Sequence, residues 1–313
     1  MSSEQRRIVN VGLIGCGETV QVAHIPTLLF MRNWFRITFL CDVSGATVKH
    51  CSESIPYEVQ TTPSPQELCA SREVDVVLIA SSDEYHVTHV IIALQQDKHA
   101  LVEKPLALMQ RDVQAIIEAE KKSKGNVMVG YMRRYAVPFE DAIREKIGGV
   151  DKILYARVRD IIGPNSAFVL QSGTFPKKFI DFDQEDGTDK NNRAKEMVKT
   201  ALETEAGGIA VTEDSTRMWR LFGGLGSHDL SVMREVLGMP EKVVGSSIGF
   251  PFWNVLFKYS GFTVSYDSGI DDIPRFYAHI EVYGMAKTVK VQYDTPYVKG
   301  LPVTLHISEN VSM

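Results

Sequence analysis

The chain has 313 residues, a length typical of two domains rather than one. Hydrophobic residues make up 44% of it and charged residues 23%, a balance that indicates a globular protein and excludes a disordered one. The net charge of −5 gives no electrostatic reason to expect nucleic acid as a partner. We find no signal-peptide pattern and no apolar run of about 18 residues, so we expect a cytoplasmic protein with no membrane partner.

The four cysteines all lie in the first quarter of the chain, and no two of them have the CxxC spacing. Three lie in or beside apolar runs, which favours buried thiols in a reducing compartment over disulfides or zinc ligands. The eight histidines form no zinc-like pattern either, so we predict no metal site. The cysteines are Cys16, Cys41, Cys51 and Cys69.

The first 130 residues alternate between short β-rich runs and helical patterns. The start of one helix is marked by Ser64–Glu67, with a capping serine, a proline at the first position and a glutamate at the third. Arg111–Lys122 is a second helical pattern, which ends in lysines. The alternation predicts a Rossmann-type, doubly wound parallel sheet over residues 1–131. The β-rich runs are continuously apolar, as in strands covered on both faces: Ile8–Gly15, Arg36–Cys41, Val74–Ala80, His99–Val102 and Asn126–Tyr131.

The second part of the chain has β-rich runs with more alternation and more turn residues between them. Ser260–Gly261 and Gly284–Met285 are typical of hairpin connections. We therefore predict a second, α+β domain over residues 132–313, built on a largely antiparallel sheet. Its predicted strands are Lys152–Ile162, Lys242–Phe250, Val255–Tyr259, Phe262–Tyr266, Arg275–Tyr283 and Lys287–Tyr293.

A polar stretch, Lys177–Glu205, separates the first of these strands from the others. It carries five acidic residues between Asp181 and Asp189. The stretch is either a solvated excursion or a lid or recognition loop over a site.

A glycine-rich turn follows the first predicted strand and opens a helix. Such a turn is tight, and it lets a pyrophosphate approach the backbone at a helix N-terminus. The third position of this fingerprint is Val20 rather than Gly or Ala, so a turn without a ligand stays an alternative. As a dinucleotide site, the turn would contribute contacts from Gly15, Cys16, Gly17, Glu18 and Thr19.

Asp42 ends the second predicted strand, near the spacing of roughly 20 residues that separates the glycine turn from a ribose-binding acid. A carboxylate there accepts hydrogen bonds from ribose hydroxyls and repels a 2′-phosphate. Because Val43 follows it rather than an arginine, we predict NAD as the cofactor in preference to NADP. The alternative is that Asp42 caps the next helix.

Several segments, taken in order, resemble the glucose–fructose oxidoreductase/inositol dehydrogenase family (Gfo/Idh/MocA). The most specific is Glu103–Lys104–Pro105 after a predicted strand. Residues 12–28, 75–90 and 130–139 are similar to further family segments, with Met132 in place of an asparagine. Trp219–Arg220 and Gly226–Ser227–His228 are similar to its Trp-Arg and Gly-x-His elements.

The resemblance implies an active site between the two domains, with Lys104 and His228 as catalytic residues. Oxidising an alcohol by hydride transfer requires a base for the hydroxyl proton and a cation near the developing alkoxide, and Lys104 can supply either. The alternatives are a surface ion pair for Glu103–Lys104 and a helix cap or packed polar group for His228. Ser81, Ser82, His86 and Glu103 are then further cofactor contacts, together with Lys104.

The resemblance also implies an open second sheet whose free face forms a homodimer or homotetramer. It further implies a small, carbohydrate-like substrate. Its candidate contacts are Arg134, Trp219, Arg220 and Asp229.

Two departures from the family pattern keep other functions open. Gly224 stands where active dehydrogenases carry an aspartate four residues before the histidine, and the chain stops soon after Lys287–Tyr293, where we expect the family's further helix to be missing. We therefore retain three hypotheses: an NAD-dependent sugar or polyol oxidoreductase, a nucleotide-binding regulator or pseudoenzyme without turnover, and a lyase or glycosidase that keeps its NAD bound.

Overall fold

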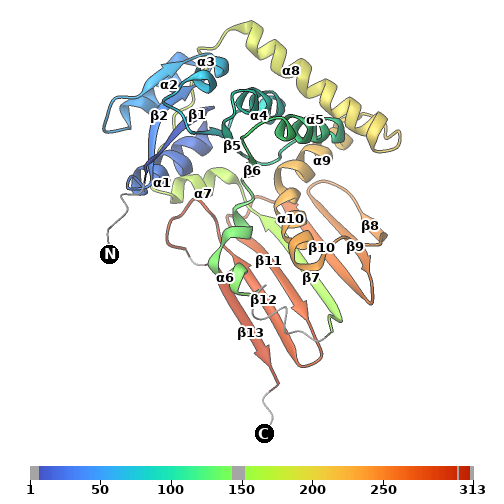
Figure 1. Ribbon diagram of the computed structural model, residues 1–313. Helices are drawn as coiled ribbons and strands as arrows, with labels where there is room; N and C mark the ends of the chain where they lie inside the picture. The colour runs from blue at the N-terminus through green and yellow to red at the C-terminus, as the bar shows by residue number, and fades with distance from the viewer. Residues whose placement is uncertain (1–6, 143–151, 302, 311–313) are drawn as a thin grey trace. The chain divides into compact units, whose positions relative to one another are not determined.

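The chain divides into two units (Figure 1). The computed structural model describes residues 7–142, 152–301 and 303–310. Unit 1 comprises Met1–Gly130 and Thr174–Thr212, and unit 2 comprises Tyr131–Gly173 and Glu213–Met313. Residues 174–212 thus belong to unit 1, whereas the sequence analysis placed them in a second domain over 132–313. Residues 174–212 cluster with unit 1 because Lys177, Asp181 and Asp189 form hydrogen bonds with Gln21, Ala46 and Tyr85 of that unit.

The sheet of unit 1 is parallel throughout, which confirms the predicted doubly wound fold. Its strand order, β3-β2-β1-β4-β5-β6, reverses between β1 and β4, the point at which such sheets bind ligands. The sequence did not predict β3, because this edge strand is short and polar. The strands are β1 (Val9–Ile14), β2 (Phe35–Cys41), β3 (Gln60–Thr62), β4 (Val76–Ile79), β5 (His99–Val102) and β6 (Val127–Val129).

Helices cover both faces of this sheet and bury its alternating side chains. Leu13 and Leu78 pack on the side of η1, α1 and α2, while Ile14 and Ile79 pack on the side of α3, α4 and α5. The helical segments are η1 (Val20–His24), α1 (Ile25–Phe30), α2 (Gly45–Glu53), α3 (Pro65–Ala70), η2 (Asp83–Tyr85), α4 (His86–Gln95), α5 (Gln110–Lys121), α8 (Gln184–Lys199) and η5 (Thr200–Glu205). Among the residues described, no helix is long and apolar enough to cross a membrane.

Helix α8 lies in the polar stretch that the sequence analysis left without secondary structure (Figure 1, yellow). Only Met197 and Val198 are buried along its length, so it lacks the apolar periodicity that predicts a packed helix. Acidic residues in its first turn and Lys199 in its last turn instead complement the helix dipole.

Two glycines of the turn after β1 have different surroundings. Gly15 has a φ of +89°, and a Cβ there would lie 2.5 Å from the backbone nitrogen of Ser81. Only glycine fits both this backbone conformation and this close approach of β1 to the loop after β4. A Cβ on Gly17 would meet no described atom within 4 Å, so the backbone of Gly17 faces open space.

The sheet of unit 2 has the order β13-β12-β11-β7-β10-β9-β8. Only β7 and β10 pair in parallel, and the hairpins β9–β10 and β11–β12 form where the sequence predicted them. The sequence did not predict β13, an edge strand with little buried surface. The strands are β7 (Tyr155–Ile162), β8 (Lys242–Ser247), β9 (Phe252–Tyr259), β10 (Phe262–Ile270), β11 (Phe276–Tyr283), β12 (Lys287–Tyr293) and β13 (Thr304–Glu309).

Residues of α6 (Val137–Asp141), α9 (Glu213–Leu221) and α10 (Ser227–Leu237) pack in one core with this sheet. Helix α10 begins at Ser227, three residues before the predicted helix Leu230–Leu237, so His228 and Asp229 lie in its first turn. The helical segments are η3 (Met132–Tyr135), α6 (Val137–Asp141), α7 (Asn165–Gln171), α9 (Glu213–Leu221), η6 (Phe222–Gly226) and α10 (Ser227–Leu237).

The substitution Gly15→Ala is expected to lower the free energy of unfolding by about 3 kcal/mol or more, because the added methyl group strains the backbone and meets the Ser81 backbone. Gly17→Ala is the matched control, and we expect it to change the same quantity by less than about 1 kcal/mol. Urea denaturation followed by circular dichroism measures both. Equal losses in the two variants would contradict the different roles assigned to these glycines.

Candidate functional site

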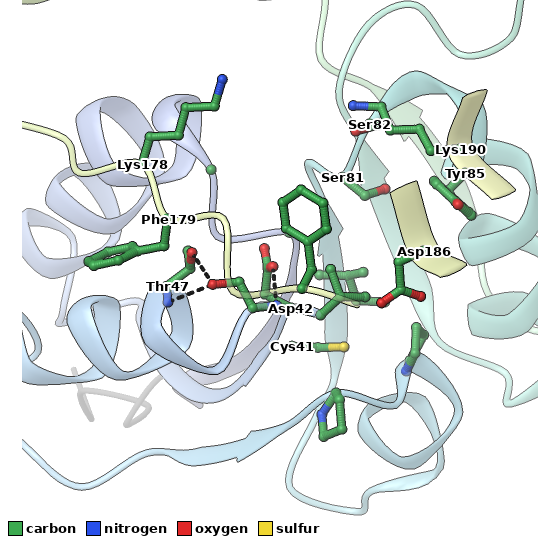
Figure 2. Close-up of a pocket in the computed structure, with 18 of the residues that line it drawn as sticks. Cys41, Asp42, Thr47, Ser81, Ser82, Tyr85, Lys178, Phe179, Asp186 and Lys190 are labelled. Atoms are coloured by element: carbon green, nitrogen blue, oxygen red, sulfur yellow. Dashed lines mark hydrogen bonds between the residues drawn. The ribbon is translucent and has the colours of Figure 1, made fainter. Parts of the chain in front are cut away.

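A cavity of about 600 Å³ lies within unit 1, at the carboxyl ends of β1, β2 and β4 (Figure 2). This is the position at which a doubly wound sheet binds ligands. Figure 2 shows Asp42 between Thr47 and Phe179 on the α2 side and Ser81 on the β4 side. Six predicted cofactor residues line the cavity: Gly15, Gly17, Glu18, Asp42, Ser81 and Ser82.

Asp42 joins the glycine turn to the start of α2. Its Oδ2 accepts a hydrogen bond from the backbone nitrogen of Cys16 at 2.7 Å, and its Oδ1 accepts one from the backbone nitrogen of Ser44 at 3.0 Å. Ser44 then caps α2, since its hydroxyl accepts from the backbone nitrogen of Thr47. The alternative prediction was that Asp42 caps α2. Asp42 instead bonds to the capping residue, Ser44, and it also lines the cavity.

The other predicted residues of the turn do not line the cavity in the part of the chain that the structure describes. Cys16 is fully buried and contributes its backbone nitrogen to Asp42. Val20, in the third fingerprint position, is fully buried in the core between the sheet and α2. A larger residue than glycine fits there because the chain enters a wide, π-type helical turn at η1. Thr19 precedes that turn and is half-buried.

Two histidines organise the loop after β4. His89 Nδ1 lies 2.9 Å from the hydroxyl of Ser81 and lines the cavity, and burial lowers the pKa of His89 to about 4. His86 is buried outside the cavity lining, with its ring nitrogens 2.7 Å from the carbonyl oxygen of Pro105 and 3.0 Å from that of Ser81. His86 therefore links the loops after β4 and β5 rather than facing the cavity.

The segment Glu103–Lys104–Pro105 follows β5. Glu103 Oε1 lies 2.8 Å from Nε2 of His24, and Glu103 Oε2 accepts from the backbone nitrogen of Lys104 at 3.2 Å. Burial raises the pKa of Glu103, but the bond to His24 and the charge of Lys104 outweigh burial and leave this pKa below its usual value. Glu103 and Lys104 are both half-buried, and neither lines the cavity among the described residues.

Residues 174–190, which we call the strap, supply the rest of the cavity wall. A lid is one of the two interpretations that the sequence of this region allows. The sequence assigns no residue of it to the site, because a polar stretch has no pattern that predicts its contacts. The strap residues that line the cavity are Pro176, Lys177, Lys178, Phe179, Phe182, Asp186, Gly187, Asp189 and Lys190.

Polar contacts join both ends of the strap to residues of η1 and η2 in the same unit. The side-chain amide of Gln21 donates to the carbonyl oxygen of Lys177 at 3.0 Å and accepts from its backbone nitrogen at 2.8 Å. At the far end the hydroxyl of Tyr85 donates to Asp189 at 2.8 Å. Arg193, in α8, also donates to Asp189 and stacks on the ring of Tyr85. The strap therefore closes over the cavity rather than extending into solvent.

The middle of the strap bonds to the first turn of α2. Asp181 accepts a hydrogen bond from the hydroxyl of Ser44 through Oδ1, and one from the backbone nitrogen of Ala46 through Oδ2 at 2.9 Å. Both bonds lower the pKa of Asp181, and the bond from Ser44 has the larger effect. The ring of Phe179 lies beside His50 of the same helix, with 5.9 Å between centroids.

The remaining predicted site residues belong to unit 2. His228 is buried, and the ring of Tyr131 packs edge-on against it with 6.2 Å between centroids. Arg134 pairs with Glu235, and both line a second cavity of about 760 Å³ within this unit. Trp219 and Arg220 are half-buried at the end of α9.

Asp229, a predicted substrate contact, is bonded within the core of unit 2. Its Oδ1 accepts from Arg133 at 2.5 Å, and Arg133 also donates to Asp160 at 2.9 Å. All three side chains are buried. Burial and the neighbouring Asp160 carboxylate raise the pKa of Asp229 well above its usual range.

No group of three or more His, Cys, Asp or Glu side chains within the described ranges is arranged to hold a metal ion.

The Glu103–His24 contact predicts a pH-dependent stability. Because folding lowers the pKa of Glu103, this side chain stabilises the fold above its unfolded value of 4.5, and that contribution is lost as the pH falls through the lower, folded value. We expect Glu103→Gln to cost about 1–2 kcal/mol of unfolding free energy at pH 7. The difference from the wild type should shrink below pH 4.5 in urea titrations at several pH values. A difference that is constant with pH would contradict this prediction.

Comparison with known proteins agrees with the family resemblance of the first part of the chain. Residues 9–131 match the family model GFO_IDH_MocA, described as an oxidoreductase family with an NAD-binding Rossmann fold. The inositol 2-dehydrogenase of Salmonella paratyphi B is 31% identical over 129 residues, which cover 41% of this chain and 37% of that enzyme. The inositol 2-dehydrogenase of Paracoccus denitrificans is 30% identical over 161 residues, or 50% of this chain and 48% of that enzyme. The matched stretch thus spans less than half of each curated relative.

The fold is also shared with solved structures over nearly the whole chain. The WlbA dehydrogenase of Bordetella pertussis, solved in complex with NADH and UDP-GlcNAcA, superposes with a TM-score of 0.69 at 15% identity. The superposition covers 98% of this chain and 79% of that one. The family match itself includes the glycine turn, Asp42 and Glu103–Lys104–Pro105. Residues 9–131 thus match the NAD-binding Rossmann domain of the Gfo/Idh/MocA oxidoreductase family, and the likeness over the rest of the chain is one of fold.

Proposed function

We propose that this protein is an NAD-dependent oxidoreductase that transfers a hydride between the nicotinamide and a hydroxyl or carbonyl carbon of a sugar, a polyol or a related small molecule. The observation that carries the proposal is the cavity at the carboxyl ends of β1, β2 and β4, which is lined by the glycine turn and Asp42. The inositol 2-dehydrogenases that the first unit resembles support a polyol-like substrate.

The β2 end of the cavity suits the adenosine ribose. A carboxylate has about four acceptor positions, and the bonds from Cys16 and Ser44 occupy two of those on Asp42. The others are available to ribose hydroxyls without breaking the internal bonds. Val43, the next residue, adds no cation that would pair with a 2′-phosphate, which supports NAD over NADP.

The middle of the cavity suits a pyrophosphate. Gly17 presents backbone to open space at the start of a helical segment, where negative charge is favoured. Lys177, Lys178 and Lys190 line the same cavity and bring positive charge to it from the strap. Figure 2 shows Lys178 and Lys190. Together these groups offset the charge of two phosphates without an arginine.

The proposed chemistry uses Lys104, at the carboxyl end of β5. NAD supplies the hydride acceptor when it is bound, and the protein must take the hydroxyl proton and steady the developing alkoxide. Lys104 is half-buried, and its backbone nitrogen is held by Glu103, which in turn bonds to His24. We include His228 of unit 2 in the same proposal as a second proton-transfer residue.

The cofactor assignment is tested by thermal unfolding of the wild type with NAD⁺, NADH, NADP⁺ and NADPH, because a ligand that binds only the folded state raises the unfolding temperature. We expect a clear rise with NAD⁺ and NADH. Gly17→Ala should reduce the NAD⁺ affinity at least about tenfold, because its methyl group occupies the space that the pyrophosphate needs. Wild-type protein that responds to none of the four would contradict the proposal.

The catalytic assignment is tested with Lys104→Met and Lys104→Arg in an NADH absorbance assay over sugars and polyols. We expect turnover to fall at least about 100-fold in both variants, the size of a lost proton-transfer group, with NAD⁺ affinity unchanged within about threefold. Wild-type turnover in Lys104→Met would refute the role of this lysine. Wild-type protein that binds NAD⁺ but oxidises no alcohol would instead favour a nucleotide-binding regulator.

A further inference from the structure

The first turn of α2 holds a carboxylate from the strap where a bound anion would be stabilised. A helix N-terminus favours negative charge because its first backbone nitrogens have no partner within the helix. Here Ser44 caps the helix and Ala46 is its second residue, and both donate to Asp181. Asp181 is 135 residues away from Ala46 in sequence, so this contact is a tertiary one.

This position adjoins the proposed ribose site. Ser44 lies two residues beyond Asp42, and its backbone nitrogen donates to the Asp42 carboxylate at 3.0 Å. Asp42, Val43, Ser44 and Thr47 all line the same end of the cavity. The carboxylate of Asp42 would repel a phosphate on the ribose 2′-oxygen. The neighbouring donors that could bind this phosphate are the Ser44 hydroxyl and the backbone nitrogens at the start of α2.

Asp181 already accepts from both of these donors. A 2′-phosphate would therefore meet two carboxylates, Asp42 and Asp181, and like charges at such separations repel. Without Asp181, the same place would offer a hydroxyl and a helix N-terminus, a combination that binds phosphate well, and Lys178 adds a positive charge to the lining of the cavity.

We propose that Asp181 is a specificity-determining residue, which fills the anion position at the start of α2 and so excludes the 2′-phosphate of NADP. The inference rests on the proposed dinucleotide site and deepens it. Discrimination then depends on two carboxylates from distant parts of the chain, Asp42 at the end of β2 and Asp181 in the strap.

The test compares dissociation constants for NAD⁺ and NADP⁺ in the wild type, Asp181→Asn and Asp181→Ala by isothermal titration calorimetry. Asp181→Asn removes the charge and keeps the shape of the side chain but only one of its two acceptor oxygens, while Asp181→Ala releases both donors. We expect the ratio of the NADP⁺ to the NAD⁺ dissociation constant to fall about tenfold in the first variant and further in the second. ADP-ribose and its 2′-phosphate derivative should show the same change, because they carry the adenosine end alone.

The matched control is Asp183→Asn, which removes the same charge two residues along the strap. Asp183 precedes α8 and makes no side-chain capping bond there. Its variant should keep the wild-type ratio, and unfolding temperatures without ligand should show that all variants are folded.

The outcomes separate this inference from the proposed function. A wild type that binds NAD⁺ strongly, with ratios equal in Asp181→Asn, Asp181→Ala and Asp183→Asn, would overturn the role of Asp181 and leave the dinucleotide site intact. A wild type that prefers NADP⁺ would overturn both the role of Asp181 and the choice of NAD. A wild type that binds no dinucleotide would overturn the proposed function and the inference with it.

Discussion

The carboxylate of Asp42 is the interaction on which the candidate site depends. Through one oxygen it fixes the backbone of the glycine turn at Cys16, and through the other it fixes Ser44 at the start of α2. The glycine turn and the start of α2, which are separated in sequence by η1, α1 and β2, are thereby held in one geometry at the carboxyl edge of the sheet. The close approach of Gly15 to Ser81 adds the end of β4 to the same arrangement. The cavity exists because these three strand ends converge, and its chemistry follows from what they present: open backbone at Gly17 and a carboxylate with acceptor positions to spare.

The strap extends this local arrangement to a distant part of the chain. It enters at the contact of Lys177 with Gln21, reaches α2 through Asp181, and is fastened again where Asp189 meets Tyr85. The segment brings both signs of charge to the cavity, with lysines and aspartates in its lining. Exposed ion pairs contribute little stability individually. We propose that these charges instead influence which ligand the cavity accepts, because they lie at defined positions around it.

The sequence predicted the parts of this site that depend on local pattern. The glycine turn, Asp42, and all the strands of the first sheet except β3 follow from apolar runs and turn residues that are close together in the chain. The strap could not be predicted in the same way, because α8 buries only Met197 and Val198 and its partners lie far away in sequence. The predicted start of α10, at Leu230, was three residues too late, because Ser227–Asp229 has the composition of a helix cap. The contact of Asp229 with Arg133 in the core was also missed, because no sequence pattern marks a buried ion pair.

The central claim is that the cavity of unit 1 binds a nicotinamide dinucleotide beneath the strap. Amide hydrogen exchange followed by mass spectrometry tests it most directly, because it reports which backbone segments a ligand protects. On addition of NAD⁺ we predict slower exchange in three separate segments: the glycine turn, the region from Asp42 to Thr47, and the strap. Protection confined to other segments, or no protection at NAD⁺ concentrations that raise the unfolding temperature, would contradict the account.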